Sequence, residues 1–410
     1  MNLKNKVLAL GILCALGLPQ AAEAEGFAIN EWSAEGVAMG GARMFAEGDA
    51  ANVAYNPASI TKVDGEAFKV SATYLSPHGE YDLYNKNGDV IDSGTNRVHF
   101  GFAPGTYYVK KLNNKDWFGI GACSRFAMVS EFERDSDVST NAFLSRLNGV
   151  SVTPTFAHKF DDKWSAAVGA EINYVGLTME KNLILDAPTH TKGESYALGW
   201  NAAANYAFDD KNEIGVVYRS RIKHSMEADF NAYNFMGTGK TVSGDAYGEV
   251  TLPESWHIGY SHKFNDKTRV ELNAVRTGWD TYKNLDIMLS NTGMLDGLQR
   301  NPKNWEDGWR YAIGVEHKLS DKYTLMAGFA YDESSIPYNG GDFMVPTGNR
   351  KTYSIGARYN DKDQTLAIAL GWMDVGDLRF AFRDSGGVNG HAHTHDSFTK
   401  IIGISYQRNF

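Results

Sequence analysis

The residues best suited to ligand chemistry are five basic side chains, each near the loop-side half of a predicted strand or beside one of the motifs described below. They are Arg125, Lys181, Arg219, Arg221 and Arg310. A carboxylate that leaves water needs a cation or several hydrogen-bond donors, so an inward-facing member of this set would hold an acidic ligand. Each of them taken alone also fits a solvated charge at a strand end.

Patterns typical of enzymes are absent from the sequence. There is no Gly-x-Ser-x-Gly elbow, and nucleophilic catalysis requires a nucleophile held by a base. The histidines that could act as such a base are scattered along the chain: His158, His224, His257, His262 and His317. The sequence therefore predicts no enzyme activity, no catalytic residues and no cofactor.

Residues 391–396 read His-Ala-His-Thr-His-Asp. In an extended backbone the three imidazoles would share one face and could hold a divalent metal weakly. The same run fits a solvated loop, which is the interpretation we adopt, so no metal site is predicted.

The elements that position these residues follow a secretory signal. Two lysines precede an apolar stretch at residues 7–18, and the small-residue site Ala22-Glu23-Ala24 comes next. This order predicts a signal peptide at residues 1–24 and a mature chain that begins near Glu25.

Cleavage at this site sets the charge and the cysteine content of the mature chain. It removes two lysines and one glutamate, so the net charge moves from −9 to −10, which argues against nucleic-acid binding. It also leaves Cys123 as the remaining cysteine, which excludes an intrachain disulfide and a cysteine-based metal site.

Beyond the signal, the chain has no run of about 18 apolar residues, the length that a membrane-spanning helix requires. The mean hydropathy is −0.37. Membrane-spanning helices are therefore excluded, and only a closed β-barrel could cross a bilayer. A soluble all-β secreted protein would share this composition, so the pattern along the chain has to distinguish the two.

One short element recurs six times: an apolar residue, two residues drawn from Asp, Asn and Ser, and then Lys. The copies lie at residues 112–115, 160–163, 208–211, 264–267, 319–322 and 359–362. Asp and Asn tolerate the left-handed backbone of tight hairpins, so each copy is predicted to be a turn.

Alternating side chains flank these turns. The apolar residues at even positions in 166–174 share one face, and Glu171 and Asn173 share the other, which is the period of a strand. Each stretch between turns is long enough for two strands joined by a longer loop. Six hairpins and one strand at each end predict an all-β chain with a transmembrane barrel of fourteen antiparallel strands, an even number as in bacterial outer-membrane barrels.

The barrel is predicted to occupy residues 65–410, with an N-terminal hatch, or plug, at residues 25–64. The hatch residues are rich in Gly, Ala and Asn and show no alternation, and Phe27, Ile29 and Trp32 make them too apolar for a disordered tail. A barrel of about 14 strands is too wide to be filled by its own side chains, so a plug is expected inside it.

The last predicted strand, residues 398–410, alternates apolar side chains and ends in Phe410. A carboxy-terminal aromatic residue of this kind resembles the signal read by the barrel-assembly machinery, although Arg408 interrupts the stripe. This feature predicts a multi-pass protein of the bacterial outer membrane that contacts that machinery through Phe410.

Five segments form an ordered set: Glu-Gly-Phe-Ala-Ile-Asn-Glu at 25–31, Asn56-Pro57-Ala58, Leu-Pro-Glu-Ser-Trp at 252–256, Asn-Trp-Glu-Asp-Gly-Trp-Arg-Tyr-Ala-Ile-Gly at 304–314, and Phe-Ala-Tyr-Asp-Glu-Ser-Ser-Ile-Pro at 329–337. Together they resemble the FadL family of outer-membrane channels for long-chain fatty acids and hydrocarbons. The resemblance runs from residue 25 to residue 410, and the last three segments follow the family's order and spacing.

The resemblance implies a 14-stranded barrel, in agreement with the count from the turns, and passive uptake of hydrophobic compounds. It implies that the hatch shifts to admit an amphipathic ligand, which then leaves sideways through the wall. The strand that is kinked in the family to open the wall corresponds to residues 119–132. A glycine expected near its middle is replaced around Ala127.

The residues expected to bind the ligand are Phe27, Asn30, Arg125, Lys181, Arg219 and Arg310, and the approximate family position supports Lys181 and Arg310. Asn56 and Pro57, followed by Ala58, are expected to fix a turn that docks the hatch onto the wall. Residues 142–147 have the spacing of a short amphipathic helix, which could capture the ligand outside or only shield the barrel mouth.

A general porin for small polar solutes is the alternative function. A porin needs an open lumen, whereas a hatch would close it, so single-channel conductance distinguishes the two. In either case we expect a monomer whose other contacts are outer-membrane lipid and lipopolysaccharide.

Overall fold

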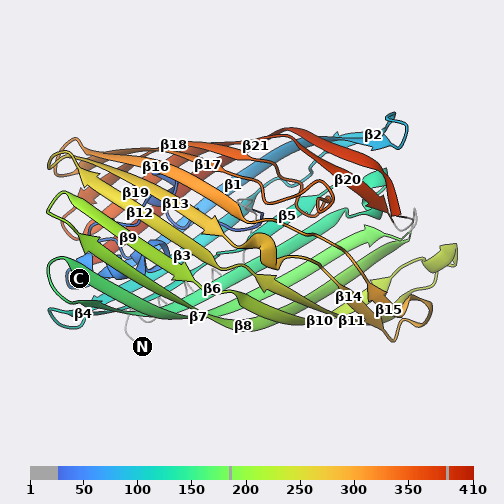
Figure 1. Cartoon of the computed structure of the whole chain (residues 1–410), viewed down its shortest axis with the longest axis horizontal. Coiled ribbons are helices and arrows are strands. Elements are labelled where there is room, and N and C mark those ends of the chain that lie inside the picture. Colours follow the sequence, from blue (N-terminus) through green and yellow to red (C-terminus); the bar gives the residue numbers. More distant parts are fainter. Residues whose placement is uncertain (1–25, 184–186, 385–386) are drawn as a thin grey trace.

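The computed structural model describes residues 26–183, 187–384 and 387–410. The predicted signal peptide at residues 1–24 lies outside them. The described chain is all-β, and its wall is one closed antiparallel barrel (Figure 1). Fourteen strands pair in order around the described wall, and the first pairs with the last: β1 (Glu66–Asn85), β3 (Gly101–Lys111), β4 (Asp116–Cys123), β6 (Leu144–Lys159), β7 (Trp164–Asn182), β8 (Pro188–Ala207), β9 (Asn212–Arg219), β12 (Ser255–Lys263), β13 (Thr268–Thr277), β16 (Gly308–Lys318), β17 (Tyr323–Asp332), β18 (Arg350–Asp361), β19 (Gln364–Val375) and β21 (Gly387–Asn409).

Shorter strands lengthen the wall at the end opposite the carboxy terminus (Figure 1). They are β2 (Val90–Thr95), β5 (Ala127–Glu131), β10 (Ile222–Ala232), β11 (Val242–Leu252), β14 (Ile287–Ser290), β15 (Gly297–Gln299) and β20 (Leu378–Asp384). The two ends of the barrel therefore differ, with short turns at one and an extended rim of strands and loops at the other, as in outer-membrane barrels.

Helices are short throughout the described ranges. They are α2 (Ala34–Ala38), α3 (Asn52–Tyr55) and the 3-10 turns η1 (Pro57–Lys62), η2 (Asp137–Thr140), η3 (Phe235–Gly237), η4 (Trp279–Thr281) and η5 (Gly293–Leu295). None of these described helices is long and apolar enough to cross a membrane.

The six predicted turns all lie at the carboxy-terminal end of the barrel, and five of them have the predicted bounds. Their Asx side chains close the turn, as Asp161 does when its Oδ1 accepts from the backbone N–H groups of Lys163 (2.8 Å) and Trp164 (2.7 Å). The sixth is displaced, because β18 continues to Asp361 and Lys362 turns the chain with a φ of 47°. The count of fourteen strands from the turns is confirmed.

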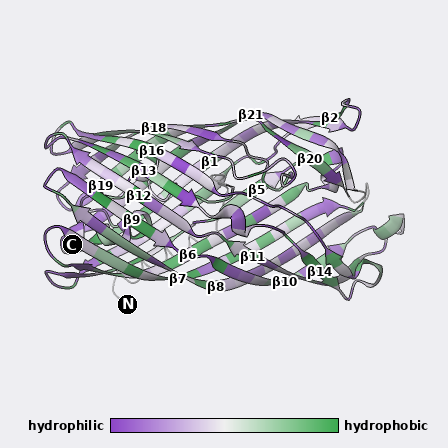
Figure 2. Ribbon diagram, viewed as in Figure 1, coloured by the Kyte–Doolittle hydropathy of each residue, from purple (hydrophilic) through white to green (hydrophobic). Residues whose placement is uncertain are grey.

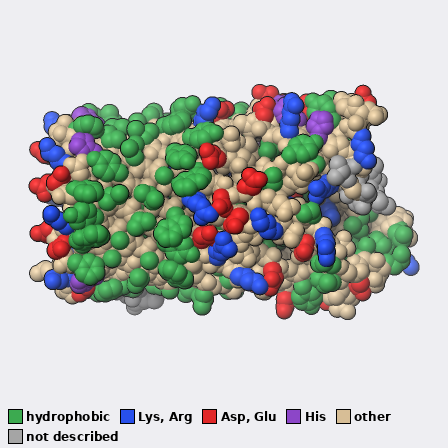
Figure 3. Space-filling model, viewed as in Figure 1, with side chains coloured by type: hydrophobic (Ala, Val, Ile, Leu, Met, Phe, Trp, Pro, Cys, Tyr) green, Lys and Arg blue, Asp and Glu red, His purple; other side chains and the backbone are tan. Residues whose placement is uncertain are grey.

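The outer surface carries an apolar band. Outward side chains such as Val168 and Leu198 are 61% and 75% exposed, which suits contact with lipid rather than water. In Figure 2 the strands alternate between hydrophobic and hydrophilic residues. In Figure 3 hydrophobic side chains cover the half nearer the short turns, and charged side chains gather beyond them.

Two local expectations were wrong. Residues 142–147 do not form a helix, because Leu144 begins β6 and pairs with both β5 and β7. Residues 391–395 are not a loop, because they belong to β21 and pair with β1 and β20. In both cases a ladder to strands distant in the sequence prevails over the local pattern.

Candidate functional site

Residues 26–64 lie inside the barrel and form what we call the inner segment; in Figure 1 they are the blue part of the chain. Helix α2 contacts β1, β17, β18, β19 and β21. The approach is close enough that a Cβ on Gly328 would lie 2.1 Å from the carbonyl carbon of Met39. We divide the inner segment into a tip, residues 26–32, and a base, residues 33–64.

Ion pairs buried from solvent join the base to the wall. Lys69 on β1 lies 2.7 Å from Glu35 and 2.9 Å from Asp49 of the base. Asp49 in turn binds Arg43 at 2.8 Å. Each of these side chains is at most 5% exposed. Removing charges from water is costly unless each finds a partner, and here each does.

The same network continues along the wall beneath Arg43. Glu316 accepts from Arg269 at 2.8 Å and from Arg358, and it lies 4.0 Å from Arg43. Glu271, which pairs with Arg269 at 2.7 Å, also accepts from the backbone N–H groups of Met44 and Phe45. The eight charges are Lys69, Arg43, Arg269 and Arg358 against Glu35, Asp49, Glu271 and Glu316, so the network is neutral.

Asp49 lies at the centre of this network. Burial by itself would raise the pKa of the Asp49 carboxyl, but the positive charges of Lys69 and Arg43 outweigh it and hold that pKa well below its ordinary value. Asp49 is therefore ionised at neutral pH and remains paired with both cations.

The Asn56-Pro57-Ala58 motif docks the base onto β8. Asn56 caps η1, because its Oδ1 accepts from the N–H of Ala58 at 3.1 Å, and Pro57 occupies the first position of η1. The amide of Asn56 donates to Oδ1 of Asn205 on β8 at 2.7 Å. Asn205 donates back to Ser59 at 2.9 Å, so the motif is tied to the wall by reciprocal hydrogen bonds.

The tip is held differently, by aromatic side chains. Phe27 is 2% exposed, and its ring centroid lies 4.6 Å from that of Trp279, 5.9 Å from Tyr282 and 5.9 Å from Trp305. Gly26 has a φ of 71°, and a Cβ there would lie 2.5 Å from the Trp305 ring, so only glycine fits. Asn30 is half-buried, and its N–H donates to Glu31 at 3.0 Å.

The tip also pairs with an interruption in the wall. Residues 124–126 separate β4 from β5, and the β3–β4 ladder ends where Cys123 faces Gly105. Ile29 N–H donates to the Arg125 carbonyl at 2.8 Å, and Ala127 N–H donates to the Phe27 carbonyl at 3.0 Å. These two bonds flank an antiparallel bridge between Ala28 and Phe126.

Above this point the described β3 and β5 share no ladder. Residues 101–104 of β3 pair only with β1, and β5 pairs only with β6. Arg97 N–H donates to the Glu131 carbonyl at 2.7 Å and closes the far side of the interruption. The interruption lies within residues 119–132, where the resemblance predicted a kink.

The glycine that makes room for the interruption is not in the kinked strand. It is Gly149 on the neighbouring β6, where a Cβ would lie 2.3 Å from the Phe126 carbonyl oxygen. A search for glycine within residues 119–132 could not have found it, because the contact crosses between strands.

Beyond the tip, the lumen is filled with apolar side chains from many strands and loops. Together with Phe27, this upper cluster includes Phe126, Met128, Phe132, Met226, Trp279, Tyr282, Trp305, Phe343, Met344 and Phe380. Most of its aromatic members lie in loops without periodicity, which is why the sequence did not indicate them.

Three of the predicted cations have partners. Arg125 pairs with Glu171 at 2.7 Å. Arg219 donates to the Ala54 carbonyl and lies 5.7 Å from the Trp32 ring. Arg310 pairs with Asp332 at 2.8 Å and donates to the Gly40 carbonyl at 2.6 Å. The last two hold the inner segment.

Below the tip little free volume remains. A cavity of about 10 Å³, roughly the space of one water, is lined by Trp32, Ala54, Cys123, Arg125 and Arg219. At this level the inner segment and its partners occupy the lumen.

Arg221 and Lys181 have opposite surroundings. Arg221 is half-exposed and pairs with Glu254 and Asp280. Lys181 lies on the β7 face that also carries Val175, Leu177 and Met179, which pack in the upper cluster. Among the described residues its ammonium group has no hydrogen-bond or ion-pair partner, so it is a cation available at the lumen mouth.

Lys303 is a lumen cation that the sequence analysis missed. It is 1% exposed, pairs with Asp342 and lies 3.7 Å from the Met344 sulfur. Lys303 and Lys181 are close enough for their charges to repel. The signal in the sequence was its place directly before the Asn-Trp segment at 304–314, but its acidic partner lies 39 residues away.

An open groove of about 840 Å³ lies on the outer face at the junction of β8 with β10. On one side β8 pairs with β7 throughout, whereas on the other its ladder with β10 ends at Glu194 and its ladder with β9 begins at Asn201. Residues 195–200 therefore lack a ladder partner on that second side. The groove is lined by both apolar and acidic side chains. Its lining includes Tyr196, Met226, Tyr247, Met288 and Leu298, with Glu194, Glu227 and Glu249.

Comparison with known proteins agrees with this architecture. The chain matches the family described as outer membrane protein transport protein (OMPP1/FadL/TodX) over residues 15–410. A long-chain fatty acid transport protein of Escherichia coli strain K12 is 24% identical over 413 residues, which cover 89% of this chain and 91% of that protein. Outer membrane protein P1 of Haemophilus influenzae is 25% identical over 443 residues, with 93% and 91% covered.

Solved structures have the same fold. A FadL homologue of Pseudomonas aeruginosa superposes with a TM-score of 0.85 at 17% identity and covers 94% of this chain and 100% of that chain. The toluene transporter TodX of P. putida superposes with a TM-score of 0.72 at 18% identity, with 95% and 99% covered. The family match spans nearly the whole sequence, and the barrel has the fold of these proteins, so the chain belongs to the OMPP1/FadL/TodX family of outer-membrane transport proteins.

Proposed function

We propose that this protein is a passive channel that carries hydrophobic compounds, long-chain fatty acids or hydrocarbons, across the outer membrane. Relatives named for the transport of long-chain fatty acids and of toluene support this substrate class. The observation that carries the proposal is the position of Phe27: it ends the apolar upper cluster, and its carbonyl is bonded to the interrupted wall.

Entry begins at the extracellular rim. The outer groove with Tyr196, Met226 and Tyr247 offers an apolar surface to a compound that leaves water or lipid. From there the compound enters the upper cluster, where burial stabilises it by about 25 cal/mol for each Å² of apolar surface removed from water.

Lys181 selects the head group of an acidic ligand. Its ammonium group is unpaired among the described residues and points into the lumen mouth, so a carboxylate bound there keeps its charge while its tail lies in the upper cluster. The partners of Arg125, Arg219 and Arg310 argue for a holding role of these three side chains.

Release requires movement of the tip and not of the base. We infer that residues 25–64 act as a hatch whose base stays attached while residues 26–29 of the tip break two backbone hydrogen bonds and withdraw Phe27 from its aromatic neighbours. The interruption between β3 and β5 then offers a sideways exit into the membrane.

A disulfide between tip and wall tests this mechanism. Ala28 and Phe126 face each other in an antiparallel bridge, a pairing with Cβ atoms about 4.5–5.5 Å apart, near the range of disulfides. We expect the double variant Ala28→Cys/Phe126→Cys, in a Cys123→Ser background, to lose uptake of a radiolabelled long-chain acid when oxidised and to recover it when reduced.

The single variant Phe126→Cys in the same background is the matched control, because it loses the ring but forms no crosslink. Its uptake should not respond to the oxidant. Full uptake by fully crosslinked protein would show that the tip need not move.

The role of Lys181 is tested by ligand binding. Lys181→Gln should weaken binding of a fluorescent long-chain acid by at least about 10-fold, because a hydrogen bond to a charged group is worth about 1.5–3 kcal/mol. It should leave the alcohol of the same chain length unaffected. Lys192→Gln is the control, because Lys192 is exposed on the adjoining β8. Equal affinity of wild type and Lys181→Gln for the acid would mean that the channel recognises only the apolar chain.

A further inference from the structure

A stripe of histidines and carboxylates runs along the outer face of the barrel seam, where the first and last strands meet. On β21, His391, His393 and His395 face outward. In the register of the seam they lie opposite Tyr84, Asp82 and Glu80 of β1. The stripe lies beyond the apolar band, at the end with the long strands, where solvent reaches it (Figure 3).

A bulge concentrates the donor groups at one point of this stripe. Asp396 and Ser397 together oppose Gly79, and Asp396 has a φ of 47°. A regular strand would turn Asp396 to the face opposite His395. The bulge instead brings its carboxylate to 3.0 Å from Nδ1 of His395. Gly79 makes room for the extra residue, because a Cβ there would lie 2.7 Å from the Ser397 hydroxyl.

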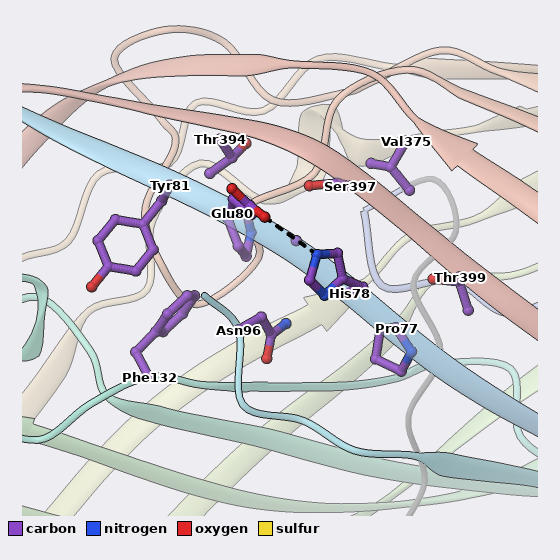
Figure 4. Close-up of a pocket in the computed structure, with 12 residues that line it drawn as sticks. Pro77, His78, Glu80, Tyr81, Asn96, Phe132, Val375, Thr394, Ser397 and Thr399 are labelled. Atoms are coloured by element: carbon purple, nitrogen blue, oxygen red, sulfur yellow. Dashed lines mark ion pairs between the residues drawn. The ribbon is translucent and has the colours of Figure 1, made fainter. Parts of the chain in front are cut away.

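Donor atoms converge on this bulge from both strands. One ligand atom from each of Glu80, His395 and Asp396 lies within 4.8 Å of the others. Asp82 lies 3.5 Å from Nε2 of His395, and His78 lies 3.6 Å from Glu80 (Figure 4). The Nε2 atom of His395 is buried and forms no hydrogen bond.

The carboxylates at this point contact histidines. Among the described residues, no lysine or arginine forms an ion pair with Glu80, Asp82 or Asp396. The carboxylates of Glu80 and Asp396 lie close enough to repel each other, and a divalent cation would remove that repulsion.

We propose that Glu80, His395 and Asp396 form an extracellular site for a divalent transition metal such as zinc. Imidazole and carboxylate donors suit Zn²⁺, which takes three protein ligands and completes its coordination with water. Bonds of about 2.0–2.2 Å require the donor atoms to move closer together than they are here. The exposed Glu80 and Asp396 side chains are free to do so. The metal clamps the first strand of the barrel to the last, outside the membrane.

Metal titration of the full-length mature protein tests the site. The protein is purified in detergent without an affinity tag, because a histidine tag binds the same ions, and Zn²⁺ binding is measured by calorimetry. We expect one site for each chain. Affinity should fall at least about 10-fold in His395→Gln and in Glu80→Gln, since a missing ligand costs at least as much as a lost supporting contact.

His391→Gln is the matched control. Its imidazole lies on the same face of the same strand, stacked on Tyr84 with ring centroids 4.6 Å apart and away from the bulge. Its Zn²⁺ affinity should equal that of the wild type. Folding of every variant is checked by the shift in gel mobility on heating that folded barrels show.

Three results would overturn the proposal: no saturable Zn²⁺ binding, equal affinity in wild type and His395→Gln, or tighter binding of Mg²⁺ or Ca²⁺ than of Zn²⁺. The last would mean that the imidazole plays no part, because those ions take oxygen ligands. Uptake of hydrophobic compounds is not expected to change, so this test is independent of the proposed transport mechanism.

Discussion

The base and the tip of the inner segment are bound to the same barrel by different interactions. The base is held by buried ion pairs and by the Asn56 turn, and its charges pair with charges of opposite sign on β1 and β16. Residues 26–29 of the tip carry no charge and are held by Phe27, two backbone hydrogen bonds and a 3.4 Å bond from Arg350 to the Gly26 carbonyl. The adjoining Glu31 and Trp32 are hydrogen-bonded to the wall by Thr73, Ser71, Tyr107 and Ser124.

This difference determines which part can move. Pulling the base away would leave Lys69, Arg43 and their carboxylates buried without partners, at a cost of about 3–5 kcal/mol for each broken pair. Withdrawing residues 26–29 of the tip breaks two backbone hydrogen bonds worth about 1 kcal/mol each and a long bond from Arg350 to the Gly26 carbonyl, and it exposes rings that an apolar ligand can cover. An arriving hydrophobic compound therefore compensates for loosening the tip but not for loosening the base.

Deletion gives the largest expected effect. Removing residues 26–64 should leave a folded barrel with a strongly raised single-channel conductance in planar bilayers, because the lumen loses its filling. Removing residues 26–32 alone should raise conductance far less, since the base stays in place. A silent channel after the larger deletion would contradict the sealing role, and a large steady conductance of the intact protein would favour a general porin.

Breaking the ion network should have the next largest effect. Lys69→Met leaves Glu35 and Asp49 short of a buried cation and should destabilise the attachment of the base by about 3–5 kcal/mol. Detachment of the base should appear as long-lived openings in single-channel conductance recordings. Lys110→Met is the control, because that lysine also lies in a barrel strand but forms its ion pair with Glu66 at the surface. Equal behaviour of the two variants would mean that the buried charges do not hold the base.

Truncation of Phe27 should act on the tip alone. Phe27→Ala removes a buried ring, for which about 3 kcal/mol is typical, and should speed hydrogen exchange at the N–H groups of Ile29 and Ala127. Phe45→Ala removes an equally buried ring from the base and should leave exchange at those two amides unchanged. Similar exchange in both variants would show that tip and base move as one unit.

The smallest effect is expected at the docking turn. Asn56→Ala loses the η1 cap and the bond to Asn205, a change of about 1–2 kcal/mol. In a double-mutant cycle with Asn205→Ala the two losses should be less than additive, because the side chains bond each other at 2.7 Å. Strict additivity would mean that the motif caps η1 without docking it.

Much of the architecture follows from the sequence alone. The Asx-Lys turns and the alternation beside them determine where strands begin, how many there are and which face meets lipid, because each signal lies within a few neighbouring residues. One turn was displaced by two residues, at Lys362. The apolar character of Phe27, Ile29 and Trp32 likewise predicted that residues 25–64 pack inside.

The site was determined by contacts between distant residues. Nothing near Arg310 in the sequence says that it donates to Gly40, 270 residues away. Nothing near Ala127 says that Gly149 makes room for the wall interruption. The pairing of Lys303 with Asp342 depends on which segments the closed barrel brings together. The same is true of the bulge that places Asp396 beside His395. Local pattern therefore determined the wall, and only barrel closure decided what the wall holds and where its strand ladder is interrupted.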